Sequence, residues 1–117
     1  MIVILACGGR DYSDRAKVFK TLDKVVDEII CPVTLMHGGA NGADKLAAEW
    51  ANYRNIPVIE VRADWTAHGR AAGPIRNQKM LDAHCPKIVI AFAGGRGTAD
   101  MVRRSRKAGI QVIEVTA

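Results

Sequence analysis

Short apolar runs alternate with segments of helical periodicity along the whole chain. The apolar runs cover residues 2–6, 33–37, 57–61, 87–92 and 111–115, and each has the length of a buried β-strand. In the first intervening segment, Val18, Leu22, Val25 and Ile29 follow the three-to-four spacing of one buried helix face. This alternation predicts an α/β architecture, because parallel strands need helical crossovers between them.

Each predicted helix begins at a residue that suits a cap or a first turn. These starts are, in chain order, Ser13 or Asp14, Asn41 or Gly42, Gly73-Pro74, and Thr98. The first helix extends to about Ile30 before Pro32, the third ends at Pro86, and the fourth ends at about Ala108 before Gly109. The small and polar residues between the third strand and Gly73 predict a loop.

Five strands and four intervening helices predict a Rossmann-like three-layer sandwich, with a five-stranded parallel sheet and helices on both faces. We expect the strand order 3-2-1-4-5, by analogy with other Rossmann-like domains and because crossovers are right-handed. The chain shows neither a repeat nor a linker, so residues 1–117 are predicted to form a single domain.

Composition indicates which residues fill the core and in which cellular compartment we expect the protein. Hydrophobic residues make up 49% of the chain and aromatic residues only 5%, which is typical of a buried parallel sheet filled by Val, Ile, Leu and Ala. The chain contains neither an apolar run of 18 residues nor the pattern of a signal peptide, so we expect no membrane span and a cytoplasmic location. The chain has three cysteines, Cys7, Cys31 and Cys85, without a C-x-x-C pair, so we predict reduced, mostly buried thiols and neither a disulfide framework nor a structural zinc site. No spacing of His, Cys and Asp indicates a metal site, and we expect no cofactor.

Charge is unevenly distributed along the chain. The net charge is +5, and residues 61–117 carry ten Lys or Arg against four Asp or Glu. Such a basic half is compatible with an anionic small ligand or with nucleic acid. Nucleic acid is the less favoured partner, because few aromatic residues are available for stacking on bases.

Glycine-rich segments follow three of the predicted strands. They are Gly8-Gly9-Arg10-Asp11, Gly38-Gly39-Ala40-Asn41-Gly42-Ala43-Asp44, and Gly94-Gly95-Arg96-Gly97-Thr98. In the expected strand order these loops lie side by side at the carboxyl edge, where open α/β sheets bind ligands. Glycine lets the backbone approach an anion, and the helix that follows offers free N–H groups. The alternative is that these glycines only make tight turns, and no segment is a Walker A loop or a complete G-x-G-x-x-G fingerprint.

Arginines in these loops and near Gly73 are candidate phosphate ligands. Arg10 and Arg96 lie inside glycine loops, where each could clamp a phosphate or carboxylate. If Gly73 caps the third helix, Arg76 lies in its first turn and opposes the helix dipole by about 0.3–1 kcal/mol. A bound anion would remove this conflict, and we include Arg70 and Asn77 in the same candidate site. A solvated arginine is the alternative in each case.

These motifs resemble a known family. The residues that carry the resemblance are Gly8-Gly9-Arg10-Asp11-Tyr12, His37-Gly38-Gly39-Ala40, Gly42-Ala43-Asp44, Ala63-Asp64-Trp65, the segment 69–77, and Gly94-Gly95-Arg96-Gly97-Thr98-Ala99-Asp100-Met101. Over nearly the whole chain, the sequence resembles the YspA-type branch of the SLOG (Smf/DprA–LOG) superfamily. This superfamily includes lysine-decarboxylase-like phosphoribohydrolases and the DNA-binding protein DprA. The resemblance implies a Rossmann-like fold, a nucleotide or nucleotide-derived ligand, and a homodimer as in relatives.

The phosphoribohydrolase motif is incomplete in this chain. The relatives carry Pro-Gly-Gly-x-Gly-Thr-x-x-Glu with a catalytic Glu, whereas Ala93 and Met101 occupy the Pro and Glu positions here. Asp100 is one residue away, about 100° around a helix. Catalysis is therefore left open, with Asp64, Asp100 and Asp11 as the candidate catalytic residues.

Other polar and aromatic residues at the same edge have two interpretations each. Asp44 and Asp64 could contact a ligand or cap a turn, and we favour the cap for Asp44. For His37 we favour a hydrogen-bonded structural role over acid–base chemistry. Trp65 could stack on a base or pack over the core, and we favour packing.

Three functions follow from these residues. The first is a nucleotide-ligand binding module that senses or processes its ligand through glycine-rich phosphate loops. The second is a hydrolase of an N-glycosidic or phosphoester bond in a nucleotide derivative. The third is DprA-like binding of single-stranded DNA.

Overall fold

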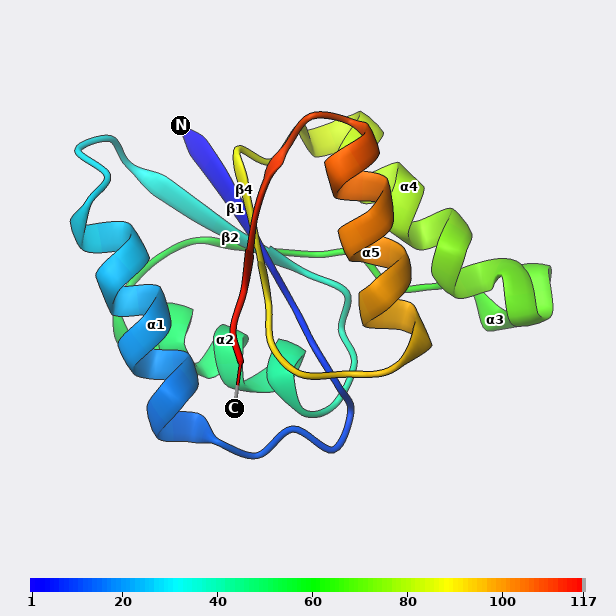
Figure 1. Ribbon diagram of the computed structural model, residues 1–117, viewed down its shortest axis with the longest axis horizontal. Coiled ribbons are helices and arrows are strands. Elements are labelled where there is room, and N and C mark those ends of the chain that lie inside the picture. Colours follow the sequence, from blue (N-terminus) through cyan, green and yellow to red (C-terminus); the bar gives the residue numbers. More distant parts are fainter. Residues whose placement is uncertain (117) are drawn as a thin grey trace.

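The computed structural model describes residues 1–116 and contains one parallel sheet with the strand order β3-β2-β1-β4-β5 (Figure 1). The strands are β1 Ile2–Cys7, β2 Val33–His37, β3 Val58–Glu60, β4 Ile88–Ala91 and β5 Gln111–Glu114. The central strand β1 pairs with β2 on one side and β4 on the other. The predicted fold class and strand order are both confirmed.

Helices cover the two faces of this sheet in pairs. The helical elements are α1 Arg15–Asp27, α2 Ala43–Tyr53, α3 Trp65–His68, the 3-10 turn η1 Gly69–Ala71, α4 Ala72–His84 and α5 Arg96–Lys107. Helices α1 and α2 lie on one face, and α4 and α5 lie on the other (Figure 1). The short helix α3 projects beyond the sheet on the α4 side (Figure 1).

Alternate residues of the buried strands supply two separate cores. Along β1, Ile4 belongs to the core under α1 and α2, whereas Leu5 belongs to the core under α4 and α5. Trp50 of α2 fills the first core, where its indole N–H donates to Asp23 at 2.8 Å. Because both faces are covered, the three inner strands β2, β1 and β4 are largely buried on both sides, as is typical of parallel sheets.

Several predicted boundaries are wrong. The predicted loop before Gly73 contains α3 and η1, and η1 runs directly into α4. Helix α4 therefore begins at Ala72, with Ala71 already helical at φ −79° and ψ −9°, and Gly73-Pro74 does not open it. Helix α5 begins at Arg96 after Gly95, so Thr98 is inside the helix and is not its cap.

The first helix is also shorter than predicted. Asp14 caps α1, because its carboxylate accepts a hydrogen bond from the Lys17 N–H at 3.0 Å. The helix ends at Asp27, and Ile30 is fully exposed beyond it. Ile29 lies in the loop after α1 but still packs against the core. Its apolar side chain therefore continues the helical spacing in the sequence beyond the true end of the helix.

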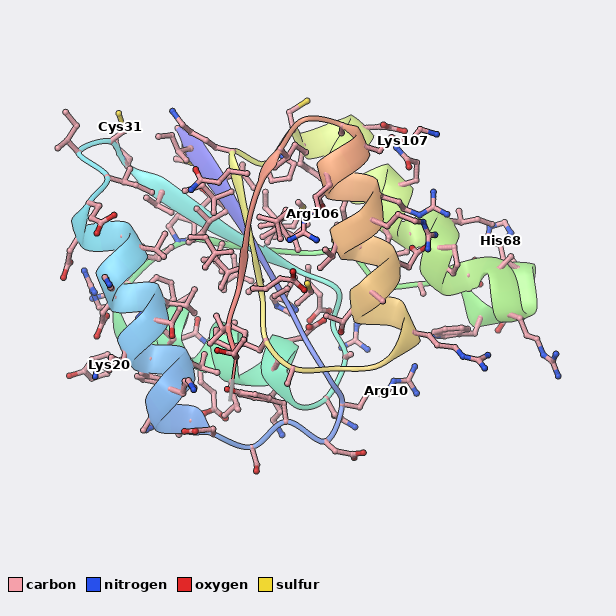
Figure 2. All side chains as sticks on the ribbon, in the orientation of Figure 1. Arg10, Lys20, Cys31, His68, Arg106 and Lys107 are labelled. Atoms are coloured by element: carbon pink, nitrogen blue, oxygen red, sulfur yellow. The ribbon has the colours of Figure 1, made fainter. Side chains whose placement is uncertain are left out.

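The prediction of mostly buried thiols is wrong for two of the three cysteines. Cys31 and Cys85 are exposed, and only Cys7 is partly covered. Both exposed cysteines lie in turns that precede β2 and β4, at the edge of the sheet opposite Arg10; Figure 2 shows Arg10 and Cys31 at these two edges. Within residues 1–116, no helix is long and apolar enough to cross a membrane.

Candidate ligand-binding site

A cleft of about 550 Å³ lies at the carboxyl edge of the sheet. The loops after β1, β2 and β4 form one side of it, and α3, α4 and the start of α5 form the other. A second hollow of about 350 Å³ adjoins it and shares Arg10, Gly38, Ala40, Trp65 and Arg76 with the cleft. The strand order thus brings the three glycine loops to one place.

Four of the glycines in these loops are required by close packing. A Cβ on Gly8 would lie 2.5 Å from the Ala43 Cβ, and one on Gly9 would lie 3.0 Å from the Ala93 carbonyl oxygen. Gly94 packs against Thr98 and Gly9, and Gly42, at φ +74°, lies against the backbone of Gly9 and Arg10. For these four positions, the tight-turn interpretation explains the glycine without a ligand.

The loop after β2 uses its own N–H groups internally. The Asp44 carboxylate oxygen Oδ2 accepts from the Gly38 N–H at 3.0 Å and from the Ala40 N–H at 3.3 Å. The Gly39 N–H donates to His37 Nδ1 at 3.0 Å. These three donors already have partners, so in this conformation they offer nothing to an anion.

The loop after β4 is different. A Cβ added to Gly95 or Gly97 would meet no atom of a distant residue within 4 Å among residues 1–116, so the space beside both glycines is open. No side chain of these residues caps α5, and the Ala99 N–H donates to the Gly95 carbonyl at 3.1 Å. In the same part of the chain, no group accepts a hydrogen bond from the N–H of Arg96, Gly97 or Thr98. The start of α5 therefore presents free donors and the positive end of a helix dipole to the cleft.

Three exposed arginines line the same cleft. Arg10, Arg70 and Arg96 form no ion pair with any of residues 1–116. Most other arginines do pair with carboxylates, namely Arg15, Arg54, Arg62, Arg103, Arg104 and Arg106. The cleft therefore concentrates positive charge that the described residues leave uncompensated.

Arg76 is held by the protein in a way that its sequence position did not indicate. Because α4 begins at Ala72, Arg76 is its fifth residue and lies beyond the first turn. The predicted unfavourable interaction with the helix dipole, which is confined to the first turn, is therefore weaker than expected. Its Nη1 donates to the Gly38 carbonyl at 2.7 Å, and its Nε donates to Asn77 Oδ1 at 2.9 Å. Burial lowers the pKa of Arg76, and the nearby Asp44 charge opposes this shift. Arg76 thus ties α4 to the loop after β2.

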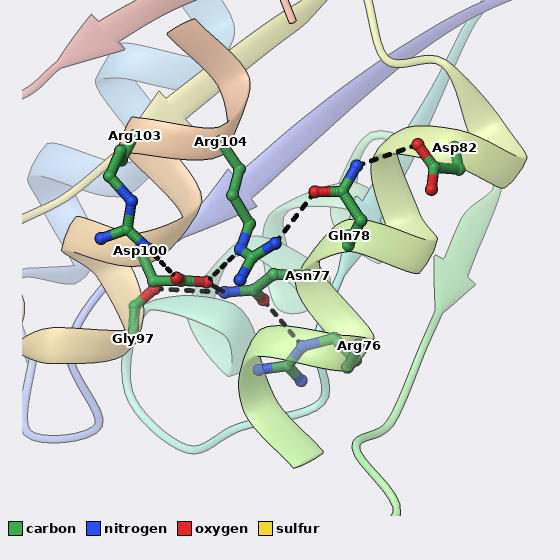
Figure 3. Close-up of polar contacts among 8 residues, drawn as sticks. All are labelled: Arg76, Asn77, Gln78, Asp82, Gly97, Asp100, Arg103 and Arg104. Atoms are coloured by element: carbon green, nitrogen blue, oxygen red, sulfur yellow. Dashed lines mark hydrogen bonds and ion pairs between the residues drawn. The ribbon is translucent and has the colours of Figure 1, made fainter. Parts of the chain in front are cut away.

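Asn77 and Asp100 form a network between α4 and α5 (Figure 3). The Asn77 amide nitrogen donates to Asp100 Oδ2 at 3.0 Å and to the Gly97 carbonyl at 3.3 Å. Arg104 Nε donates to the same Asp100 oxygen at 2.8 Å, and Arg103 pairs with the other at 2.5 Å. The network fixes the start of α5 against α4.

These contacts keep Asp100 ionised. Burial alone would raise the pKa of Asp100, but the hydrogen bonds from Asn77 and Arg104 and the charges of Arg104 and Arg103 outweigh it, so the pKa is lowered. A carboxylate with both oxygens occupied and a lowered pKa is poorly suited to carry a proton. Asp100 therefore acts in this structure as a link between two helices.

The remaining candidate carboxylates have different surroundings. Asp64 caps α3 by accepting from the Ala67 N–H at 3.0 Å, and Asp11 is exposed. Asp44 lines the cleft and is only 5% exposed, and burial raises its pKa although two backbone N–H groups and the charge of Arg76 favour its ionised form. Asp44 has the capping role that we favoured, but the N–H groups that it caps belong to Gly38 and Ala40 in the loop before α2.

His37 has the structural role that we favoured. It is buried, its Nδ1 accepts from the Gly39 N–H, and burial lowers its pKa. Nδ1 must be unprotonated to accept this bond, so the ring is neutral in this arrangement.

Two further residues line the cleft: Cys7, which the sequence did not indicate as a site residue, and Trp65, for which stacking on a base was the less favoured interpretation. Cys7 lines it, and burial, with the charge of Asp44, raises the pKa of its thiol to about 12, so the thiol is protonated. Trp65 is 51% exposed and lines both hollows, so the packing role that we favoured is wrong. The only signal in the sequence for Cys7 is its place at the end of a strand before a glycine loop.

Comparison with known proteins identifies the family. A model described as the YspA, cpYpsA-related SLOG family matches residues 2–68, more than half of the chain. The chain belongs to this SLOG family. It is also similar to the Gene 61 protein of Mycobacterium phage D29, with 36% identity over 118 residues that cover 94% of this chain and 93% of that protein.

A solved structure supports the fold of this SLOG chain. Acinetobacter baumannii MurG matches 97% of the chain with a TM-score of 0.61 and 11% identity. The chain spans 34% of the length of MurG, and at this identity the likeness shows the fold alone.

The departure from the phosphoribohydrolase motif of SLOG relatives lies in the floor of the cleft. Met101, at the Glu position of that motif, is 1% exposed and packs in the core under α4 and α5 with Met80. Both methionines line the cleft. This SLOG chain therefore presents apolar groups where the motif carries a carboxylate.

Proposed function

We propose that this chain binds a nucleotide or nucleotide-derived ligand, with a phosphate held at the start of α5. One observation carries the proposal. Among residues 1–116, the N–H groups of Arg96, Gly97 and Thr98 have no acceptor, and the space beside Gly95 and Gly97 is open. Anions bind well at such helix starts, because the donors and the dipole both favour negative charge. The SLOG family and the Rossmann-like fold fit a nucleotide-related function.

The charges around this helix start support a phosphate. Arg10, Arg70 and Arg96 line the cleft without carboxylate partners among residues 1–116. A guanidinium can donate two parallel hydrogen bonds to a phosphate. Of the candidate phosphate ligands, Arg10 and those on the loop after β4 are favoured, because the N–H groups of Gly9, Gly38 and Gly39 already donate to acceptors within the protein.

A thermal-shift panel tests this proposal. It contains AMP, GMP, cyclic nucleotides, NAD and ADP-ribose, and a ligand at 100 times its Kd stabilises the fold by about 2.7 kcal/mol. We expect Arg96→Gln to weaken binding of a positive compound roughly tenfold, which corresponds to the loss of one hydrogen bond to a charged group. Lys20→Gln, a change on α1 outside the cleft, is the matched control (Figure 2). The proposal fails if no phosphorylated compound raises the melting temperature.

Hydrolysis of the bound nucleotide is a second candidate function, and one observation favours it. Asp44 lines the cleft with a raised pKa, and none of residues 1–116 donates a hydrogen bond to its Oδ1. A carboxyl group with a raised pKa in a cleft is suited to acid–base chemistry. Product analysis after incubation with each bound compound tests this function, and Asp44→Asn should abolish any turnover while retaining binding.

A further inference from the structure

Trp65 is a large aromatic residue that the fold does not bury. Its side chain is 51% exposed, and its indole N–H donates to none of residues 1–116. Trp50, the other tryptophan, is 0% exposed and hydrogen-bonded to Asp23. A Cβ on Gly73 would lie 3.5 Å from Trp65 Cη2, so the edge of the indole rests against α4. One tryptophan thus belongs to the core, and the other is presented to the cleft.

Arg10 lies over the ring of Trp65, near the outer limit of about 6 Å for a cation–π contact. The distance from Arg10 Cζ to the ring centroid is 5.8 Å. Direct stacking needs about 3.5 Å between layers, and a planar ring placed between the two groups needs about 7 Å. Because the layer spacing cannot exceed the centroid distance, Arg10 must move outward by at least about 1 Å to admit one aromatic ring. Such a shift is easy for an exposed side chain that forms no ion pair with residues 1–116.

We propose that Trp65 and Arg10 hold the aromatic base of the ligand between them. This inference rests on the proposed function, because the same cleft connects Trp65 to the start of α5 where the phosphate is held. The indole provides a stacking surface, and the guanidinium adds a cation–π contact on the other side. The ligand class is a phosphorylated compound that carries an aromatic base, so a sugar phosphate without a base occupies only the phosphate end.

Tryptophan fluorescence separates the two ends of the cleft. The probes are the four nucleoside 5′-monophosphates AMP, GMP, CMP and UMP, with ribose 5-phosphate as the compound without a base. We expect at least one nucleotide to quench Trp65 emission, whereas ribose 5-phosphate raises the melting temperature without quenching. Trp65→Phe removes the signal and retains a stacking ring, and the buried Trp50 gives the unchanged background.

The alanine variant measures what the stack contributes. Trp65→Ala should weaken nucleotide binding on the order of 5- to 150-fold, the range for loss of one base–aromatic stack. Trp65→Phe should weaken it much less, and neither variant should change the affinity for ribose 5-phosphate. Because Trp65 is half exposed and outside both cores, we expect both variants to fold.

The outcomes distinguish this inference from the proposed function. If a nucleotide raises the melting temperature but leaves Trp65 emission unchanged, or if Trp65→Ala binds it with unchanged affinity, the stacking inference is overturned and the phosphate site stands. If none of these compounds and no compound of the thermal-shift panel raises the melting temperature, both are overturned. If Trp65→Ala weakens ribose 5-phosphate as much as the nucleotides, Trp65 supports the cleft and the stacking inference is overturned.

Discussion

The loops after β2 and β4 are both rich in glycine, but they use their backbone N–H groups in opposite ways. In the loop after β2, the N–H groups of Gly38, Gly39 and Ala40 donate hydrogen bonds to Asp44 and His37. In the loop after β4, the N–H groups at the start of α5 have no acceptor among residues 1–116. Glycine content alone therefore does not identify an anion site.

The glycine surroundings show the same contrast. Gly42 is enclosed by the backbone of the neighbouring loop, whereas Gly97 faces open space. A glycine that packing requires should not tolerate a side chain, and a glycine kept for a ligand should tolerate one at the expense of binding. Substitutions in the two loops can break or sharpen this comparison.

The largest effect is expected for Gly42→Ala. Gly42 has φ +74°, and a Cβ there would lie 2.5 Å from the Arg10 carbonyl oxygen. Strain from the left-handed backbone and overpacking together should lower the free energy of unfolding by about 3 kcal/mol or more. Urea denaturation measures this loss. A loss below about 1 kcal/mol would show that the loops can move apart, contrary to tight packing.

Asp44→Ala should have the next largest effect. It leaves the Gly38 and Ala40 N–H groups without their acceptor, and each unsatisfied buried donor costs about 1–3 kcal/mol. Asp44→Asn is the matched variant, because its amide oxygen can still accept both bonds. Urea denaturation should therefore rank the wild type and Asp44→Asn close together and Asp44→Ala well below both. Equal losses for the two variants would contradict a role through these hydrogen bonds.

The two buried aspartates should give opposite pH dependences of stability. Burial raises the pKa of Asp44, so its contribution is fully present below its ordinary pKa and is lost as pH rises through the folded value. For Asp100, hydrogen bonds and arginine charges overcome burial and lower the pKa, so its contribution is present above the ordinary pKa and is lost as pH falls through the folded value.

Unfolding free energies of the wild type, Asp44→Asn and Asp100→Asn across the acidic range measure these slopes. With rising pH, the advantage of the wild type should shrink against Asp44→Asn and grow against Asp100→Asn. Slopes of the same sign would contradict the different surroundings of the two carboxylates.

The smallest stability change, with the opposite sign, is expected for Gly97→Ala. Alanine at a helical position compatible with it should raise the free energy of unfolding by about 0.4–1 kcal/mol. The added methyl group projects into the open space where the proposed phosphate lies, so nucleotide binding should weaken. Denaturation and a thermal-shift titration on the same variant measure both effects. Unchanged binding would place the phosphate elsewhere in the cleft.

Much of the fold could be predicted because its signals are local. The apolar run 33–37 coincides with β2, and Asp14 caps α1 as its position indicates. The glycine loops reach one edge because the strand order brings β2, β1 and β4 together. The start of α4 could not be predicted, because η1 continues into it without the break that Gly73-Pro74 indicates.

The sequence by itself determined the strands, the helices between them and the glycine loops that follow three strands, since hydrophobic periodicity and glycine positions act over a few residues. The strand order, which brings those loops to one edge, was expected by analogy with other Rossmann-like domains. Tertiary structure alone decided which groups at that edge are free. Asp44 takes the donors of one loop, Arg76 reaches a carbonyl 38 residues away, and Asn77 meets Asp100 from 23 residues away. These partners depend on how distant segments pack, so no local pattern reveals that the start of α5 keeps its N–H groups open.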